Sequence, residues 1–104
     1  MNLNEFVKKS FEVDEYLVRP RIVCIDGFSM SVQGNKYDYC IPRKLSDKYD
    51  SMEIGFPSEK QPELMEFAEN ENDPTGTVYG YVPIELIHEV VEKHGGIDEE
   101  KTFA

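Results

Sequence analysis

The sequence has no tryptophan, only two cysteines and no long apolar run. A membrane-spanning helix needs about 20 consecutive apolar residues, which this chain does not offer. The first ten residues, MNLNEFVKKS, lack the apolar stretch of a signal peptide. We therefore expect a cytosolic protein with no membrane contact, a setting in which disulfides are rare.

Basic residues are scarce in the second half of the chain. Residues 1–48 carry eight Lys and Arg against seven Asp and Glu, whereas residues 49–104 carry three against fourteen. The net charge of −10 therefore comes entirely from the second half. A field of this sign repels nucleic acid and steers basic partners toward the protein. We expect no direct nucleic-acid binding, and a merely solubilising charge is the simpler alternative.

The length of 104 residues predicts a single globular domain spanning residues 1–104. Apolar spacing predicts helices at residues 2–11, 58–69 and 83–94. Asn2 and Glu5 have the spacing of a capping box at the first helix, and Gly95-Gly96 stops the last one. The tail, residues 97–104, is expected to fray.

Five segments show the alternating pattern of strands, at residues 21–25, 28–32, 36–42, 51–57 and 77–82. Asp26-Gly27 and Gly34-Asn35 predict two-residue turns that join the first three strands into an N-terminal meander. The predicted fold class is therefore α+β, an antiparallel four- or five-stranded sheet with two or three helices packed on one face.

The predicted turns also decide which side chains share a face of the meander. One face, expected to be the core, holds Val23, Ile25, Phe28, Met30, Val32, Tyr37, Tyr39 and Ile41. The other face, semi-polar and solvent-exposed, holds Ile22, Cys24, Ser29, Ser31, Asp38 and Cys40. The two cysteines would lie two strands apart, about 9.5–10 Å, too far for a disulfide. Both thiols are predicted to be free.

Motifs for metal, cofactor or nucleophilic chemistry are absent or incomplete. Cysteines and histidines lack zinc spacing, and Glu85-x-x-His88 lacks the second copy that a di-iron site needs. Glu69, Glu71 and Asp73 alternate like the first ligands of a calcium-binding loop. The Gly and the Glu that such a loop requires at later positions are not in place. We expect a non-catalytic protein without metal or cofactor, and a small Cys/His-dependent enzyme is the second alternative.

The segments YDYCIPR, MEIGFPSE and TVYGYVPIELI resemble small uncharacterised proteins encoded by tailed bacteriophages and prophages. The resemblance covers most of residues 1–96. It implies an accessory factor in the bacterial host cytosol that binds and disables a host enzyme or defence system. It assigns no role to any residue.

We therefore predict a phage-encoded acidic binding protein that inhibits or modulates a host protein with a basic surface, one that handles nucleic acid or serves in defence. The predicted contact residues are Glu59, Glu63, Glu66, Glu69, Glu71, Asp73, Glu85, Glu89 and Glu92. The first alternative is a small-ligand or nucleotide-binding sponge that uses Arg43, Lys44, Tyr37 and Tyr39. The sequence leaves the oligomeric state open, a homodimer included.

Overall fold

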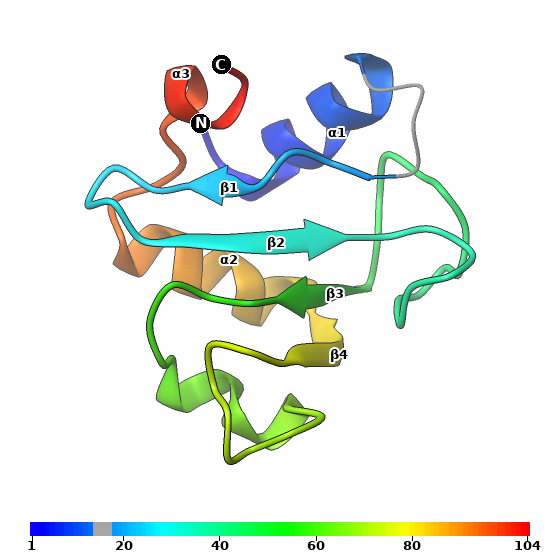
Figure 1. Ribbon diagram of the computed structural model, residues 1–104. Coiled ribbons are helices and arrows are strands. Elements are labelled where there is room, and N and C mark those ends of the chain that lie inside the picture. Colours follow the sequence, from blue (N-terminus) through cyan, green and yellow to red (C-terminus); the bar gives the residue numbers. More distant parts are fainter. Residues whose placement is uncertain (14–17) are drawn as a thin grey trace.

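The computed structural model describes residues 1–13 and 18–104. Its elements in chain order are α1 (Leu3–Val13), β1 (Ile22–Val23), β2 (Ser29–Gln33), β3 (Ser51–Gly55), the 3₁₀ helix η1 (Pro62–Phe67), β4 (Val78–Pro83), α2 (Ile84–Lys93) and α3 (Glu99–Thr102). The strands form one antiparallel sheet in the order β1-β2-β3-β4 (Figure 1). The predicted α+β class is confirmed, with four strands.

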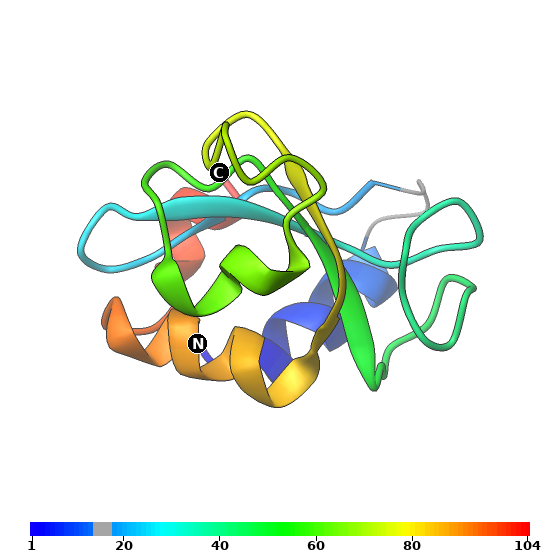
Figure 2. The same ribbon diagram turned by 90° about the horizontal axis from the view of Figure 1, so that it is seen from below.

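Helices α1 and α2 lie side by side on one face of the sheet, and η1 flanks its β4 edge (Figure 2). The apolar stripe of α1 buries Leu3 and Phe6. Its predicted capping box is confirmed, since the Glu5 N–H donates to Asn2 Oδ1 (2.9 Å) and the Asn2 N–H donates to Glu5 Oε1 (3.3 Å). No helix in the described ranges is long and apolar enough to cross a membrane.

Helix α2 follows β4 directly and packs Ile87, Val90 and Val91 into the core. The predicted stop is confirmed, because Gly95 and Gly96 adopt φ values of 90° and 88°, which side chains disfavour.

The predicted helix over residues 58–69 shortens to η1, which buries Leu64. Ser58 does not cap it, because the Ser58 hydroxyl accepts the Ser29 N–H instead (2.9 Å). Gln61 takes the capping position without a side-chain cap bond, and Pro62 opens the helix.

The turn between β1 and β2 has three residues rather than the predicted two. The Cys24 N–H donates to the Phe28 carbonyl (2.7 Å), and the Gly27 N–H donates to the Cys24 carbonyl (2.9 Å). Gly27 adopts a φ of 95°, the left-handed conformation that closes three-residue hairpin turns. β1 therefore pairs Ile22 with Met30, one residue out of the predicted register.

A slip of one residue exchanges the two faces of a strand, and the predicted faces of β1 are wrong for this reason. Ile22 and Cys24, assigned to the solvent-exposed face, are buried in the core. Val23 is half-buried and Ile25 is 59% exposed, although both were expected inside. The prediction for β2 is confirmed, with Phe28, Met30 and Val32 buried.

The predicted third strand, residues 36–42, is wrong. Residues 34–50 form a loop, and β2 pairs with β3 instead, Val32 lying opposite Ile54. The loop turns sharply because the Asn35 side chain accepts the Tyr37 N–H (2.7 Å) and the Asn35 carbonyl accepts the Asp38 N–H (3.2 Å).

This loop reverses the predicted burial of its side chains. Tyr37, Tyr39 and Ile41, expected in the core, are exposed, whereas Cys40, expected on the solvent-exposed face, is buried. Phe56, which directly follows β3, is also exposed and has a φ of 51°.

The tail is ordered, so the prediction that residues 97–104 fray is wrong. Ile97 is buried beside Cys24, with which it forms a β-bridge. The Asp98 side chain caps α3 by accepting the Lys101 N–H (3.1 Å). The Thr102 hydroxyl accepts the backbone N–H of β1 residue Val23 (3.0 Å). These contacts attach the tail to the β1 edge.

We predict that Ile97→Ala lowers the free energy of unfolding by about 2–5 kcal/mol, because it removes a buried side chain and leaves a cavity. Chemical denaturation followed by circular dichroism measures this. Glu100→Ala, on the exposed side of α3, is the control and should change stability little. Equal stability of the Ile97 variant and the wild type would mean that the tail does not pack.

Candidate functional site

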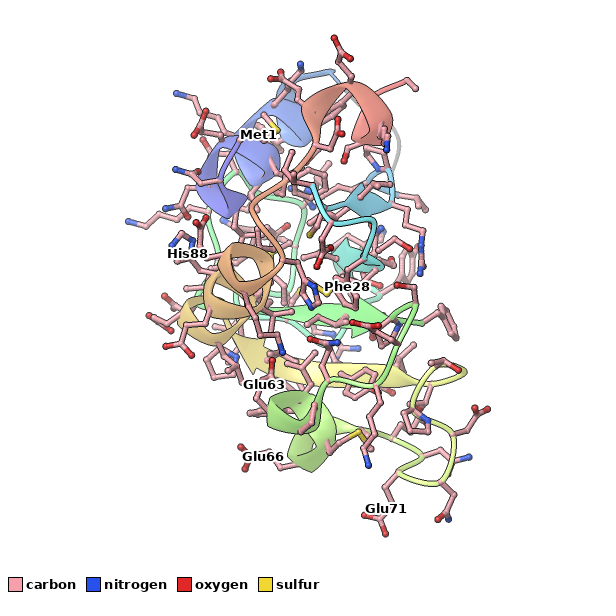
Figure 3. The ribbon with its side chains drawn as sticks, turned by 90° about the vertical axis from the view of Figure 1, so that its left-hand side faces the viewer. Met1, Phe28, Glu63, Glu66, Glu71 and His88 are labelled. Carbon is pink, nitrogen blue, oxygen red and sulfur yellow. The ribbon has the colours of Figure 1, made fainter. Side chains whose placement is uncertain are left out.

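The acidic residues predicted to contact a partner come from η1, the segments on either side of it and α2. All are exposed except Glu63, which is half-buried. In Figure 3, Glu66 and Glu71 project away from the body of the molecule, and His88 lies on the outer side of α2. We call the following residues the acidic surface: Glu59, Glu63, Glu66, Glu69, Glu71, Asp73, Glu85, Glu89 and Glu92.

An ion pair between Glu63 and Lys93 joins η1 to α2 and so brings the two parts of the acidic surface together. Partial burial alone would raise the pKa of Glu63, but the Lys93 ammonium lowers it below its ordinary value. Lys93 is thereby neutralised, and Lys60 is the only other Lys or Arg between residues 59 and 93. The surface is therefore strongly negative.

The residues of the predicted ligand sponge are only partly brought together. The Arg43 guanidinium lies 5.6 Å from the centre of the Tyr39 ring. Tyr37 instead contacts the Lys36 ammonium (5.1 Å). The Lys44 side chain is exposed and makes no hydrogen bond or ion pair with the described residues. The structure therefore pairs Arg43 with Tyr39 and leaves the other two apart.

Sequence reasoning missed a β-bulge in β4. Ile54 pairs with Tyr79 and Met52 pairs with Val82, so two residues of β4, Gly80 and Tyr81, lie opposite one residue of β3. The signal was present in TVYGYV, because an isolated glycine inside a strand pattern often marks a bulge.

The bulge places Tyr81 in a strained and exposed position. Its φ of 53° lies in the left-handed region, which costs a bulky residue about 1–3 kcal/mol. Tyr81 is 44% exposed, and its ring lies 5.8 Å from the ring of Tyr39, a residue that is also 44% exposed. The Tyr81 N–H donates to the Tyr39 carbonyl (3.0 Å), and Gly80 allows the approach, since a Cβ there would lie 3.2 Å from Tyr39 Cβ.

Two carboxyl groups, those of Asp38 and Glu53, lie close enough to interact electrostatically beside this aromatic pair. Glu53 also accepts the Tyr39 N–H (3.2 Å), and Asp38 Oδ2 is buried without a partner among the described residues. Burial raises the pKa of both groups, and for Glu53 the neighbouring Asp38 raises it further.

His94 forms a buried junction between α2, the first hairpin and η1. Its Nδ1 lies 2.6 Å from an Asp26 carboxylate oxygen, and its Nε2 lies 2.9 Å from Gln61 Oε1. The ring stacks on Phe28, with centroids 4.1 Å apart. The Phe28 N–H and then His94 lower the pKa of Asp26. Both ring nitrogens are thus committed to structural partners.

The thiols do not pair with a histidine in the part of the chain that the structure describes. Cys24 is buried in the core, and Cys40 Sγ donates to the carbonyls of Asn35 (3.4 Å) and Pro42 (3.3 Å). Burial, with smaller effects of nearby acids, raises the pKa of Cys24 to about 11, and burial raises that of Cys40. The geometry therefore gives no support to the Cys/His enzyme alternative.

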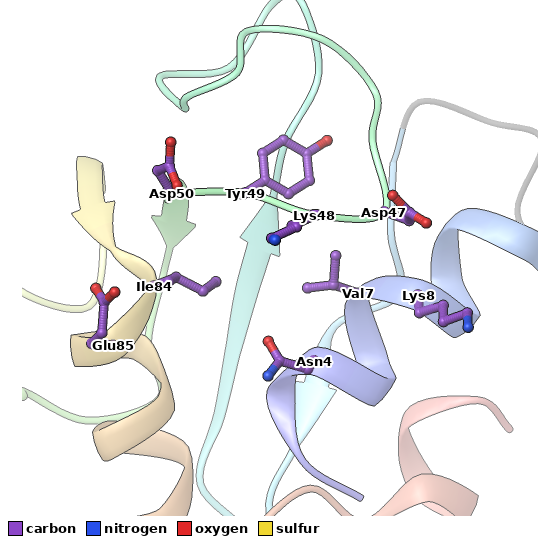
Figure 4. A pocket seen from close by; sticks show the side chains of 9 residues that line it. All are labelled: Asn4, Val7, Lys8, Asp47, Lys48, Tyr49, Asp50, Ile84 and Glu85. Atoms are coloured by element: carbon purple, nitrogen blue, oxygen red, sulfur yellow. The ribbon is translucent and has the colours of Figure 1, made fainter.

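A cavity of about 460 Å³ lies between α1, the start of α2 and the segment before β3 (Figure 4). Helix α1 contributes Asn4 and Lys8, α2 contributes Glu85, and the segment contributes Lys48 and Asp50. The lining carries both basic and acidic side chains, so it favours neither an anionic nor a cationic ligand. No cluster of His, Cys, Asp and Glu within the described ranges has the arrangement of a metal site.

We predict that Glu53→Gln becomes more stable relative to wild type as the pH rises from about 4 to about 7. A carboxyl whose pKa is raised in the folded state stabilises the protein below its unfolded pKa, and this stabilisation is lost as the pH rises through the folded value. Glutamine does not ionise, so the variant does not lose stability in this way as the pH rises. Urea denaturation at both pH values measures the difference, with Glu100→Gln as the control. A stability difference that stays constant with pH would contradict the carboxyl pair.

We also predict that both thiols of the native protein react slowly with Ellman's reagent at about pH 8, because burial and a raised pKa keep them protonated. Unfolding in denaturant without reductant should expose two rapidly reacting thiols. Fewer than two would indicate a disulfide, and a fast native reaction would contradict the burial of Cys24.

Comparison with protein-family models, with curated proteins and with solved structures finds no match to this chain. The acidic surface, the aromatic pair at the bulge and the carboxyl groups beside it are therefore the features of this chain that bear on its function.

Proposed function

We propose that this protein is a non-catalytic acidic binding protein, which contacts a protein partner with a basic surface and inhibits or modulates it. The observation that carries the proposal is the exposure of the carboxylates on η1 and α2, two elements that the Glu63–Lys93 ion pair joins. The phage resemblance adds the proposal that the partner is a host protein that handles nucleic acid or serves in defence, met in the host cytosol.

The exposure of the carboxylates supports this role. Glu66 and Glu71 have no ion-pair partner among the described residues and point outward, so they are free to meet cations on another protein (Figure 3). Exposed charges of this kind accelerate and orient association more than they strengthen the final complex. The interaction is therefore expected to weaken as salt rises, since the screening length is about 8 Å at physiological ionic strength.

The sponge alternative has weaker support. The Arg43 guanidinium already contacts the Tyr39 ring, and the separation of Tyr37 and Lys44 from that pair leaves no cluster of cations for a phosphate. One guanidinium beside several carboxylates is a poor receptor for an anion.

We predict that Glu66→Lys/Glu71→Lys lowers the association rate with the partner about tenfold, because it removes steering charge from the acidic surface. The partner is identified by affinity capture from a bacterial lysate with mass spectrometry, and the rate is then measured with the purified partner by surface plasmon resonance at low and high salt.

A matched variant, Asp47→Lys/Glu100→Lys, changes the net charge equally but lies outside the acidic surface. It should retain association near the wild-type rate. Equal losses in both variants would assign the effect to net charge alone. Loss of binding in Arg43→Glu/Lys44→Glu, with no effect of the Glu66 and Glu71 changes, would favour the sponge.

A further inference from the structure

A second cavity, of about 360 Å³, lies on β4 beside the bulge, between the end of η1 and the loop 34–50. We call it the tyrosine pocket, and it is lined by Tyr39, Phe67, Glu69, Val78, Gly80 and Tyr81. Its walls are aromatic and aliphatic, with the Glu69 carboxylate as the charged group among them. Glu69 also belongs to the acidic surface, so the pocket adjoins it.

The backbone beside this pocket is strained at Tyr81. The bulge turns Tyr81 outward at a φ of 53°, and the contact of Gly80 with Tyr39 brings the second ring alongside. Bulges and left-handed bulky residues occur where a protein re-aims a side chain for a function. Here the result is two exposed rings tilted at 44° to each other.

Carboxyl groups outnumber basic side chains around the pocket. Glu69 lines it, and the Asp38–Glu53 pair lies beside Tyr39, with an unfavourable electrostatic interaction between Glu53 and Glu69. The Arg43 guanidinium lies against Tyr39, which shows that this ring accepts a cation within the chain itself. Tyr81 has no such cation among the described residues.

We propose that the tyrosine pocket binds one basic side chain, an arginine or a lysine, of the protein partner, an inference that rests on the proposed function. The apolar stem of such a side chain fits against Phe67 and Val78, as long basic side chains pack their methylenes on apolar surface. Its charged head meets the Tyr81 ring by a cation–π contact and the Glu69 carboxylate by an ion pair. An anion is excluded by Glu69.

The test is a two-dimensional NMR titration of the full chain with N-acetyl-arginine methylamide and, in parallel, with the lysine equivalent. The neutral isostere N-acetyl-citrulline methylamide is the matched ligand control. We expect saturable shifts of the Glu69, Val78, Gly80 and Tyr81 amides with at least one basic ligand, and weaker binding of citrulline. Equal binding of citrulline, or no shift of these amides with either basic ligand, would overturn the proposal.

Variants that should stay folded distinguish a loss of binding from a loss of structure. Tyr81→Asn suits the left-handed backbone and removes the ring, so it should stay folded and weaken binding about two- to fivefold. Tyr81→Phe keeps the ring and should bind as wild type does. Glu69→Gln should weaken binding about two- to fivefold, whereas Glu100→Gln should not. Unchanged affinity in both Tyr81→Asn and Glu69→Gln would also overturn the proposal.

The titration is independent of the capture experiment. If the Glu66 and Glu71 reversals slow association but the blocked amino acids do not bind, the acidic surface stands and the pocket assignment fails. If the blocked arginine binds but the reversals have no effect, the pocket stands and the acidic surface fails as the docking site.

Discussion

The guanidinium of Arg19 is buried between α1 and the loop 34–50, and the position of that loop depends on its hydrogen bonds. It donates to Ser10 Oγ (2.8 Å), to the Gly34 carbonyl (3.0 Å) and to the Ser46 carbonyl (2.5 Å), and it lies over the Tyr49 ring (5.3 Å). A buried charge is tolerated only when such acceptors surround it. This requirement ties the two ends of the loop to the helix that covers the core.

The loop in turn builds the surface that we assign to binding. Because its ends are held, it brings Tyr39 against the bulge of β4, where the Tyr39 carbonyl accepts the Tyr81 N–H. The neighbouring carboxyl pair and Glu69 make that end of the sheet negative. The acidic surface and the tyrosine pocket therefore meet at Glu69. The shape of the pocket depends on long-range contacts, whereas the charge of the acidic surface depends on composition.

Much of the fold follows from local patterns. The capping box at Asn2, the stop at Gly95-Gly96 and the alternation of β2 are decided within a few residues, so sequence reasoning located them. Prediction from the sequence failed where the same residues fit turns of two different lengths. Asp26-Gly27 suits a two-residue turn, but the three-residue turn allows Ile22 and Cys24 to reach the core.

The sequence by itself determined the α+β class, helices α1 and α2 and most of the exposed acidic residues, because these depend on periodicity, charge and local conformation. The thiols are free as predicted, but the register from which this was argued is wrong. Only the tertiary structure decided that residues 36–42 form no strand, since β3 competes for the same edge of β2 and offers a better buried face. It likewise decided that Ile97 docks and that Tyr39 meets Tyr81. Such contacts form between residues that are far apart in the sequence. No short window of neighbouring residues therefore predicts them.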